Sequence, residues 1–476
     1  MTLFLAAAGA LALLQGKDAV PEPKAILQRA EALAAEERFD EARMLYKKLA
    51  DKFAGTPEGE IGARRSQPSA FLGWKEIVRN GPSSNRVDVV LMGDGYTLEH
   101  MKAFDKLAED VPRLFEHQRT FREYLSYFDF LRADLLSAED GIDGFGRHFD
   151  TALGGKTLGT IAGHVGIDGA RARAMLSEVP GNDGLAIVFV KQGILGTGGG
   201  GIAVIGGMSA PTVIHEWGHA FAGLSDEYDV QQSVHPGSVR SGINVSDTDD
   251  PKLVPWAHWI AAKVPGIGVY QGASGHVRGA WKPTATGCVM DHSEFFCPVC
   301  QEAIVLRIYS IVDPVDGCEP PPPPAGIREP IDLGEAPVEF RVRPMQPATH
   351  ELEVRWWVIP TASLPETRGA PKGAPGDRAR TSVEAKKSSP APASRAERGP
   401  LPLLPGRPHA TTRPNAEGVH VLRLRAADFP AGRYEVICRV RDATQMFDEK
   451  WPWVLKDDRG LLESERAWWV RVPEKR

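Results

Sequence analysis

The sequence predicts a multidomain protein that joins an N-terminal α-helical hairpin, a mixed α/β domain and a C-terminal β-sandwich. Three observations predict this order. Apolar residues recur at helical spacing near the N-terminus, short apolar runs alternate with helical patterns through the middle, and segments of alternating apolar and polar residues dominate the C-terminal third. At 476 residues, the chain is also too long for one ordinary domain.

Residues 1–20 are similar to a secretory signal peptide. Met1–Leu14 is an apolar run of the length that signal peptides have, and it is too short to span a bilayer. We therefore expect a protein that is secreted or held in the periplasm or cell envelope; the alternative is an apolar tail with no targeting role. No other stretch is long and apolar enough for a transmembrane helix, so we expect no membrane span.

Residues 21–80 are predicted to form a helical hairpin. Between residues 24 and 65, apolar side chains follow helical spacing in two stretches that meet at Phe39-Asp40. The pair resembles one tetratricopeptide repeat. Because a single repeat cannot bury its own apolar face, we expect this hairpin to dock on the next domain or on a partner.

Residues 85–316 are predicted to form the α/β domain. Buried strands are expected at 87–92, 128–136 and 185–190, with helical patterning over 99–125. A glycine tract then leads into a further strand at Gly201–Ile205, next to the segment that carries the chemistry. We expect this strand to line a cleft and to pair with an extended peptide, and the glycines before it to let the rim flex.

Residues 317–330 are predicted to be a proline-rich linker, and residues 331–476 an immunoglobulin-like β-sandwich. Several short strands with turn signals between them predict the sandwich. These strands are expected at 338–343, 351–358, 419–425, 434–440 and 467–472. Residues 365–417 are rich in Pro, Ala, Gly and Arg, and we expect them to form a disordered insertion.

Composition narrows the class of function. The chain is 42% hydrophobic and 25% charged, as soluble globular proteins are, and its net charge of −6 is small for its size. Nothing in this charge balance predicts binding to nucleic acid or to a membrane surface. The oligomeric state is not predicted by any feature of the sequence.

One segment carries the chemistry: His215-Glu216-Trp217-Gly218-His219. On an α-helix, residues four apart share one face, so His215 and His219 can present both imidazoles to one metal ion. Glu216 then lies beside the position of a metal-bound water, as a general base would. This is the arrangement of zinc peptidases, and the cofactor it predicts is Zn2+.

The surrounding residues support a helix with a ligand beyond its end. Ser209 is a plausible N-cap and Pro211 suits the first turn. Gly223 can adopt the left-handed conformation that turns the chain back. Asp226, three residues later, can then supply a third, oxygen ligand, and Met290 lies in a tight-turn sequence downstream.

Helix, glycine turn, third ligand and methionine turn together resemble the metzincin peptidases. Longer segments resemble the IgA peptidase (M64) family of zinc metallopeptidases: 87–97, 215–228, 244–259, 268–272 and 288–300. The resemblance implies a metzincin-like α/β domain, a protein or peptide substrate, and Met290 as a packing floor beneath the metal. The glycine and the third ligand each come one residue later than in metzincins, and Ser225 stands where their third histidine would be. We select Asp226 as the third ligand, with Glu227 as the alternative.

Four of the five cysteines cluster in sequence around the methionine turn: Cys288, Cys297, Cys300 and Cys318, while Cys438 lies in a strand-like run. In an exported protein, disulfides that brace this loop are favoured. A structural zinc site with four thiolate ligands and a redox Cys-Pro-Val-Cys pair are the alternatives. Cys438 is expected to be a buried small residue.

The sequence therefore predicts a secreted zinc endopeptidase. A metal-activated water would attack the peptide bond, with Glu216 as general base. Two other functions stay open: a zinc amidase that acts on non-protein amides such as cell-wall material, and a catalytically silent extracellular binding protein.

Overall fold

The computed structural model describes most of the chain. The described residues are 22–144, 146–158, 163–207, 210–229, 241–324, 326–363, 399–445 and 449–474. The signal-like segment 1–20, the expected N-cap Ser209 and most of the expected insertion (364–398) lie outside them.

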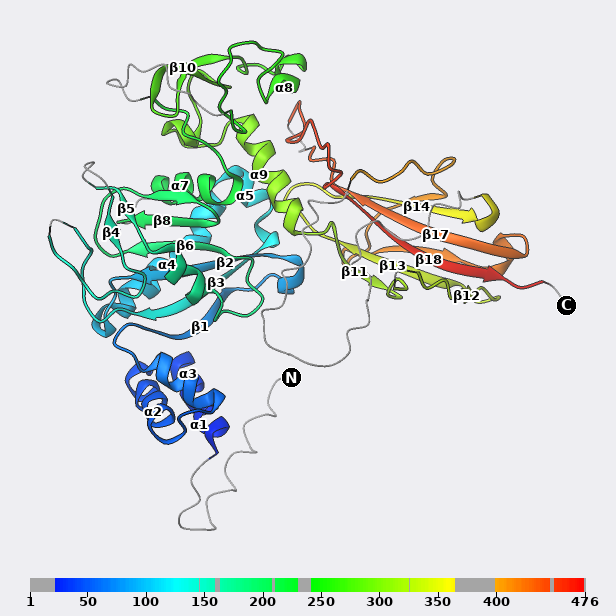
Figure 1. The fold of residues 1–476 in the computed structure, drawn as a ribbon. Coiled ribbons are helices and arrows are strands. Elements are labelled where there is room, and N and C mark those ends of the chain that lie inside the picture. The colour runs from blue at the N-terminus through cyan, green and yellow to red at the C-terminus, as the bar shows by residue number, and fades with distance from the viewer. Residues whose placement is uncertain are drawn as a thin grey trace, which may run out of the picture.

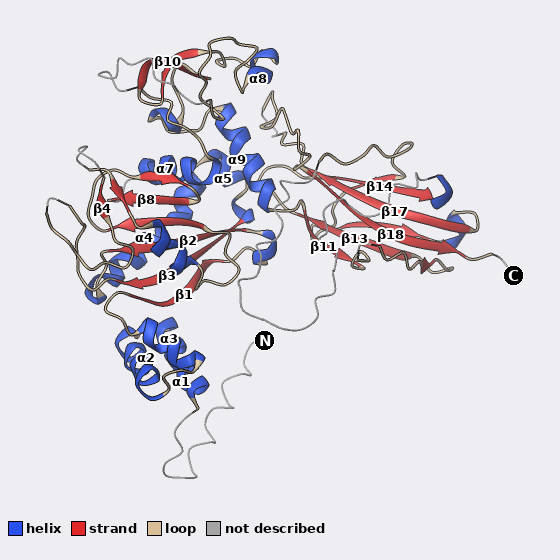
Figure 2. Ribbon diagram, viewed as in Figure 1, coloured by secondary structure: helices blue, strands red, loops and turns tan. Residues whose placement is uncertain are grey.

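The N-terminal region contains three helices, not the two that the sequence predicted (Figure 2). They are α1 (Pro23–Ala35), α2 (Phe39–Lys52) and α3 (Pro57–Arg65). Capping residues, and not apolar spacing, mark the start of the third helix. Thr56 caps it by accepting a hydrogen bond from the Gly59 amide, and Pro57 follows directly. The helices bury a small core of their own beside strand β1.

A six-stranded sheet forms the centre of the molecule, in the order β1-β3-β2-β6-β8-β7 (Figure 1). Its strands are β1 (Ala70–Val78), β2 (Val87–Asp94), β3 (Phe128–Leu136), β6 (Leu185–Val190), β7 (Thr197–Gly199) and β8 (Ile202–Gly206). The four inner strands are parallel and the two edge strands antiparallel. Every residue of the inner strands is buried, which explains their continuous apolar runs.

Two expectations about this sheet were wrong. β1 pairs with β3, so the helical region ends before residue 70 and does not extend to residue 80. The strand at 201–205 is not an edge, because β8 pairs with β6 on one side and with β7 on the other. The glycine tract itself contributes the edge strand. Glycines have no side chain, so hydrophobic periodicity could not indicate a strand there.

Helices cover both faces of the sheet. α4 (Met101–His117), α7 (Ala210–Ala222) and α9 (Pro298–Ile311) contribute to the core on one face, and α6 (Gly169–Leu176) packs on the other. The remaining short elements are α5 (Arg119–Glu123), α8 (Ala257–Ala261), β4 (Lys156–Thr157), β5 (Val165–Gly166), β9 (Tyr270–Ala273), β10 (His276–Lys282) and the 3-10 turns η1 (Ser83–Asn85), η2 (Leu98–His100), η3 (Leu125–Tyr127), η4 (Val289–Asp291), η5 (Thr361–Ser363) and η7 (Ala426–Asp428). Within the described residues, no helix is both long and apolar enough to cross a membrane.

Two further sheets form the C-terminal region (Figure 1). The first contains β11 (Val315–Glu319), β13 (Val338–Pro344) and β16 (His420–Leu424). The second contains β12 (Ile331–Asp332), β14 (Glu353–Pro360), β15 (Ala410–Thr412), β17 (Gly432–Arg441) and β18 (Glu463–Val472). Phe340 of the first sheet meets Trp468 of the second with ring centroids 5.4 Å apart, so the two sheets share a core.

Two boundaries predicted for this region were wrong. Residues 317–319 belong to β11, which starts four residues after α9 ends, so no linker separates the α/β region from the first C-terminal sheet. The expected insertion 365–417 is ordered at its end, where β15 pairs with Val354–Trp356 of β14. Backbone pairing places β15 in the sheet, and its sequence, Ala-Thr-Thr, has no apolar alternation that could have indicated this.

Candidate metal centre

Helix α7 holds the metal-binding motif against the sheet. Val213, Trp217 and Phe221 are buried on its inner side, and the Trp217 and Phe221 rings stack 5.1 Å apart. The helix ends as predicted: Gly223 has a φ of 67°, and its amide donates to the His219 carbonyl at 3.1 Å. The chain then reverses and returns past the two histidines.

The reversal brings three side chains together: His215, His219 and Asp226, called here the histidine–aspartate cluster. The Nε2 atoms of the two histidines are 3.2 Å apart, and Oδ1 of Asp226 lies 3.0 Å from His215 Nε2 and 3.1 Å from His219 Nε2. Tetrahedral ligands at about 2.0–2.1 Å from a metal are separated by about 3.3 Å. The spacing of the three donors therefore suits one small divalent cation.

Hydrogen bonds on the far side of each ring fix the protons. His215 Nδ1 lies 3.0 Å from the Val289 carbonyl oxygen, and His219 Nδ1 lies 2.6 Å from that of Leu224. A carbonyl can only accept, so Nδ1 carries the hydrogen, and the Nε2 lone pair of an unprotonated ring is directed at the cluster. Two lone pairs and a carboxylate oxygen at this distance would repel one another unless a cation lay between them. The donor set thus fits a zinc ion.

Asp226 is positioned by a dense set of hydrogen bonds. Asn244 is fully buried and brackets the preceding residue, accepting from the Ser225 amide and donating to its carbonyl, both at 2.8 Å. Ser274 donates its backbone N–H to the Asp226 carbonyl at 2.9 Å.

Glu216 is only 8% exposed, and burial raises the pKa of its carboxyl above the ordinary value of 4.5. Edge strand β7 runs close to it. A Cβ on Gly196 would lie 2.5 Å from Glu216 Cγ, and a Cβ on Gly198 would overlap the Glu216 carbonyl oxygen. The glycines of this tract therefore allow strand β7 to pack closely on helix α7. From the sequence, we expected them only to make the rim of the cleft flexible.

Comparison with known proteins places this site in a family. Residues 75–266 match the family model described as IgA Peptidase M64, and the match includes Glu216 and the whole histidine–aspartate cluster. This segment belongs to the M64 peptidase family. The description of that family is of peptidases, which act on proteins or peptides. No curated protein matches the chain.

Met290 is fully buried in η4, beyond the matched segment. A Cβ on Gly218 of α7 would lie 2.9 Å from the Met290 sulfur, so the methionine side chain packs against the metal-binding helix. Its role as a packing floor beneath the metal stays a prediction.

Two aromatic residues next to the cluster were not selected from the sequence. The His292 ring stacks on Tyr228 at 4.4 Å and on His215 at 5.7 Å. Burial, together with the negative charge of Asp226, raises the pKa of Tyr228, so its hydroxyl remains a donor at neutral pH. The sequence offered one signal for these two residues, because both lie in segments that resemble the peptidase family. Tyr228 ends the segment that contains the two histidines, and His292 follows the methionine turn.

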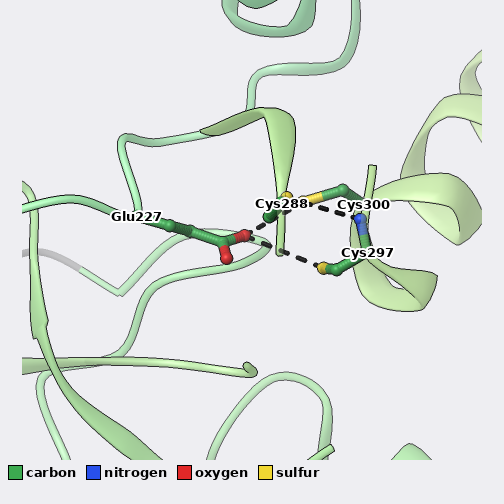
Figure 3. Close-up of side chains that lie close together, drawn as sticks. All are labelled: Glu227, Cys288, Cys297 and Cys300. Atoms are coloured by element: carbon green, nitrogen blue, oxygen red, sulfur yellow. Dashed lines mark hydrogen bonds between the residues drawn. The ribbon is translucent and has the colours of Figure 1, made fainter. Parts of the chain in front are cut away.

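Glu227, the alternative third ligand, lies in a second group of side chains. Its carboxylate faces three thiols in Figure 3, and the four residues Glu227, Cys288, Cys297 and Cys300 are called here the cysteine–glutamate cluster. Burial raises the pKa of Glu227 to about 8. Although the two residues are adjacent in the chain, Asp226 faces the histidines and Glu227 faces the cysteines.

The disulfides favoured from the sequence are not present. All five cysteines are free, and the Sγ atoms of Cys288 and Cys300 are 3.7 Å apart, against about 2.05 Å in a disulfide. Cys318, the expected fourth thiolate ligand, lies on β11 in the C-terminal region. Sequence spacing could not show that Glu227, and not Cys318, lies beside the other three cysteines. Cys438 is fully buried on β17, as predicted.

Proposed function

We propose that the protein is a zinc-dependent endopeptidase whose histidine–aspartate cluster holds the catalytic metal. The observation that carries this proposal is the set of three acceptor atoms, 3.0–3.2 Å apart, beside a buried glutamate on the same helix. When bound, zinc supplies Lewis acidity that acidifies a water and polarises the scissile carbonyl.

Glu216 acts as the proton carrier in this proposal. One of its carboxylate oxygens takes a proton from the attacking water and later returns it to the leaving amine nitrogen. Burial supports the role, because a pKa above the ordinary value makes the carboxylate a better base and keeps the proton available for the leaving group. The Nδ1 hydrogen bonds of the two histidines keep both rings in the orientation that binding requires.

Strand β7 is the proposed docking edge for the substrate backbone. Among the described strands it pairs only with β8, so its other side offers free backbone N–H and C=O groups next to Glu216 and His219. An extended peptide can add to such an edge by main-chain hydrogen bonds. The apolar side chains of Ile194 and Leu195, 72% and 40% exposed, precede the edge and offer contacts for substrate side chains.

The remaining sequence predictions become part of the same proposal. The sheet and α7 are taken as a metzincin-like catalytic domain, and the two C-terminal sheets as a β-sandwich. The apolar N-terminal run supports export to the cell exterior, periplasm or cell envelope. A metallopeptidase with an open substrate edge suits extracellular protein degradation.

Cleavage mapping tests the function. The full chain, loaded with zinc, is incubated with a denatured protein mixture, and the products are identified by mass spectrometry with and without a chelator. We expect new internal peptide termini that the chelator abolishes and that Glu216→Gln protein does not produce. Release of products from peptidoglycan alone would instead identify an amidase, and no products from either substrate would indicate a binding protein.

A further inference from the structure

The cysteine–glutamate cluster has the geometry of a metal site. One ligand atom from each of its four residues lies within 4.8 Å of the other three. The Cys288 and Cys300 sulfurs are 3.7 Å apart, and Glu227 Oε1 lies 3.1 Å from Cys300 Sγ and 3.9 Å from Cys297 Sγ. Thiolates bound tetrahedrally at about 2.3 Å from zinc are separated by about 3.8 Å. The four donors therefore already surround a position of the right size.

Burial makes this cluster hard to explain without a cation. All four residues are buried, and Glu227 is 0% exposed. Asn244 Nδ2 donates to Oε1 of Glu227 at 2.9 Å, whereas Oε2 has no hydrogen-bond partner among the described residues. A buried carboxylate oxygen without a partner costs on the order of several kcal/mol, and such groups in proteins are paired or coordinate metals.

Local structure also favours thiolates here. Cys297 is the N-cap residue of the 14-residue helix α9, and Cys300 lies in its first turn. The amides of a helix N-terminus stabilise negative charge, which lowers the cost of two deprotonated sulfurs. The Cys297 amide also points at Cys288, with N and Sγ 3.4 Å apart.

We infer that the cysteine–glutamate cluster binds a second, structural zinc ion, distinct from the one held by the histidines. Three sulfurs and one carboxylate close the tetrahedral shell and leave no open position for substrate, as in structural sites. Soft thiolate ligands select zinc over magnesium or calcium. A disulfide between Cys288 and Cys300 would use only two of these groups and leave the Cys297 thiol and Oε2 of Glu227 buried without a ligand to bind.

The second ion would stabilise the first site mechanically. It joins three segments: the chain after Asp226, the turn that contains Met290, and the start of α9 (Figure 3). The Glu227 amide donates to the Met290 carbonyl at 2.7 Å, and the neighbouring Val289 carbonyl accepts from His215. Fixing Glu227 and Cys288 therefore fixes both Asp226 and the carbonyl that orients His215.

Metal stoichiometry tests the inference independently of catalysis. The full chain is purified under reducing conditions with zinc, freed of unbound metal, and analysed by mass spectrometry for zinc content. We expect two zinc ions per chain for the unsubstituted protein and one for the double variant His215→Ala, His219→Ala, which keeps every cysteine. Cys300→Ser should also lose one ion, whereas Cys318→Ala, away from both clusters, should retain two.

Cobalt spectroscopy identifies the ligands. In the double histidine variant, Co2+ should give a thiolate-to-cobalt charge-transfer band, and adding Cys288→Ser should remove most of it. The inference is overturned if the double histidine variant binds no metal and shows no such band. It is equally overturned if alkylation finds Cys288 and Cys300 linked to each other by a disulfide in the zinc-loaded protein. Neither result depends on whether the chain cleaves peptides.

Discussion

The Glu216 carboxyl group is buried between the histidine–aspartate cluster and the glycine edge of β7, and it is a ligand in neither metal cluster. Glu216→Gln keeps the shape of the side chain and removes its ability to carry a proton. We expect kcat to fall by about 10²–10⁴-fold with the zinc content unchanged, because general acid–base catalysis contributes about that factor. Peptide hydrolysis and metal analysis on the same sample measure both. Unchanged kcat would refute the role of Glu216.

Asp226 and Glu227 are neighbours with different surroundings, so substitution can separate them. Asp226→Asn removes the negative charge between the two histidines. We expect zinc affinity of the catalytic site to fall by at least about tenfold, because losing even a residue that only orients a ligand costs about 10–100-fold. Ser225→Ala is the matched control, because its side chain is in neither metal cluster. Titration of the variants with a zinc chelator measures the affinity. Equal retention of the metal by the aspartate variant and the control would exclude Asp226 as a ligand.

At the level of the element, the turn after α7 depends on one backbone conformation. Gly223 has a φ of 67°, and a Cβ there would meet no atom within 4 Å, so the cost of Gly223→Ala is conformational strain alone. We expect a loss of about 1 kcal/mol in the free energy of unfolding. Gly317→Ala, where a Cβ also meets nothing and φ is not left-handed, should change stability by less than about 0.5 kcal/mol. Urea denaturation of both variants makes the comparison.

At strand β7, lack of space limits substitution, whereas at Gly223 only the backbone conformation does. A Cβ on Gly198 would overlap the carbonyl of Glu216 and lie 2.8 Å from Cβ of His219. Gly198→Ala should therefore push β7 away from α7, raising KM for a peptide substrate several-fold while the zinc content stays the same. Gly199→Ala, on the same strand but with no atom within 4 Å, is the control and should behave as the unsubstituted protein. Equal KM values for the two variants would contradict the proposed docking edge.

These elements also show what the sequence could and could not predict. The inner strands at 87–92, 128–136 and 185–190 were confirmed, because continuous apolar runs indicate strands buried on both faces. The turn at Gly223 was confirmed because a left-handed position is a local property. β7 and β15 were missed, since backbone pairing alone makes them strands. The cysteine–glutamate cluster was missed for a related reason: its fourth member, Glu227, is 61 residues before Cys288, and only the fold brings them together.

On the scale of the whole molecule, the α/β region and the C-terminal sheets are joined by a buried polar network. His350 lies between two carboxylates, with Nδ1 2.8 Å from Glu123 and Nε2 2.7 Å from Asp442. Tyr124 and Tyr309 both donate to the other oxygen of Asp442, at 2.8 and 2.7 Å. Glu123 ends helix α5, Tyr124 directly follows it and Tyr309 lies in α9, all in the α/β region, whereas His350 and Asp442 belong to the C-terminal region. The network therefore fixes one region on the other.

This network predicts how stability depends on pH. Burial alone would lower the pKa of His350, but hydrogen bonds to Asp442 and Glu123 raise it from 6.5 to about 9. A histidine whose pKa is higher in the folded state stabilises the fold fully below pH 6.5, and this contribution is lost as the pH rises through 9. The rise corresponds to about 3 kcal/mol at most. His350→Gln should therefore lower the free energy of unfolding by about 2–3 kcal/mol near pH 6, and by progressively less toward pH 9.

Denaturation of the zinc-loaded protein and of this variant at a series of pH values measures that difference. His409→Gln is the matched control, because the exposed His409 is outside the network and its replacement should leave the pH profile unchanged.

At acidic pH, the two carboxylates of the network change stability in the opposite direction. The pKa values of Glu123 and Asp442 are lowered in the fold, so their contribution to stability is present above the ordinary carboxyl pKa and is lost as the pH falls. A difference between His350→Gln and the unsubstituted protein that grew as the pH rose from 6 to 9 would show that His350 is buried as the neutral ring. Its contact with the two carboxylates would then not be the charged link between the two regions.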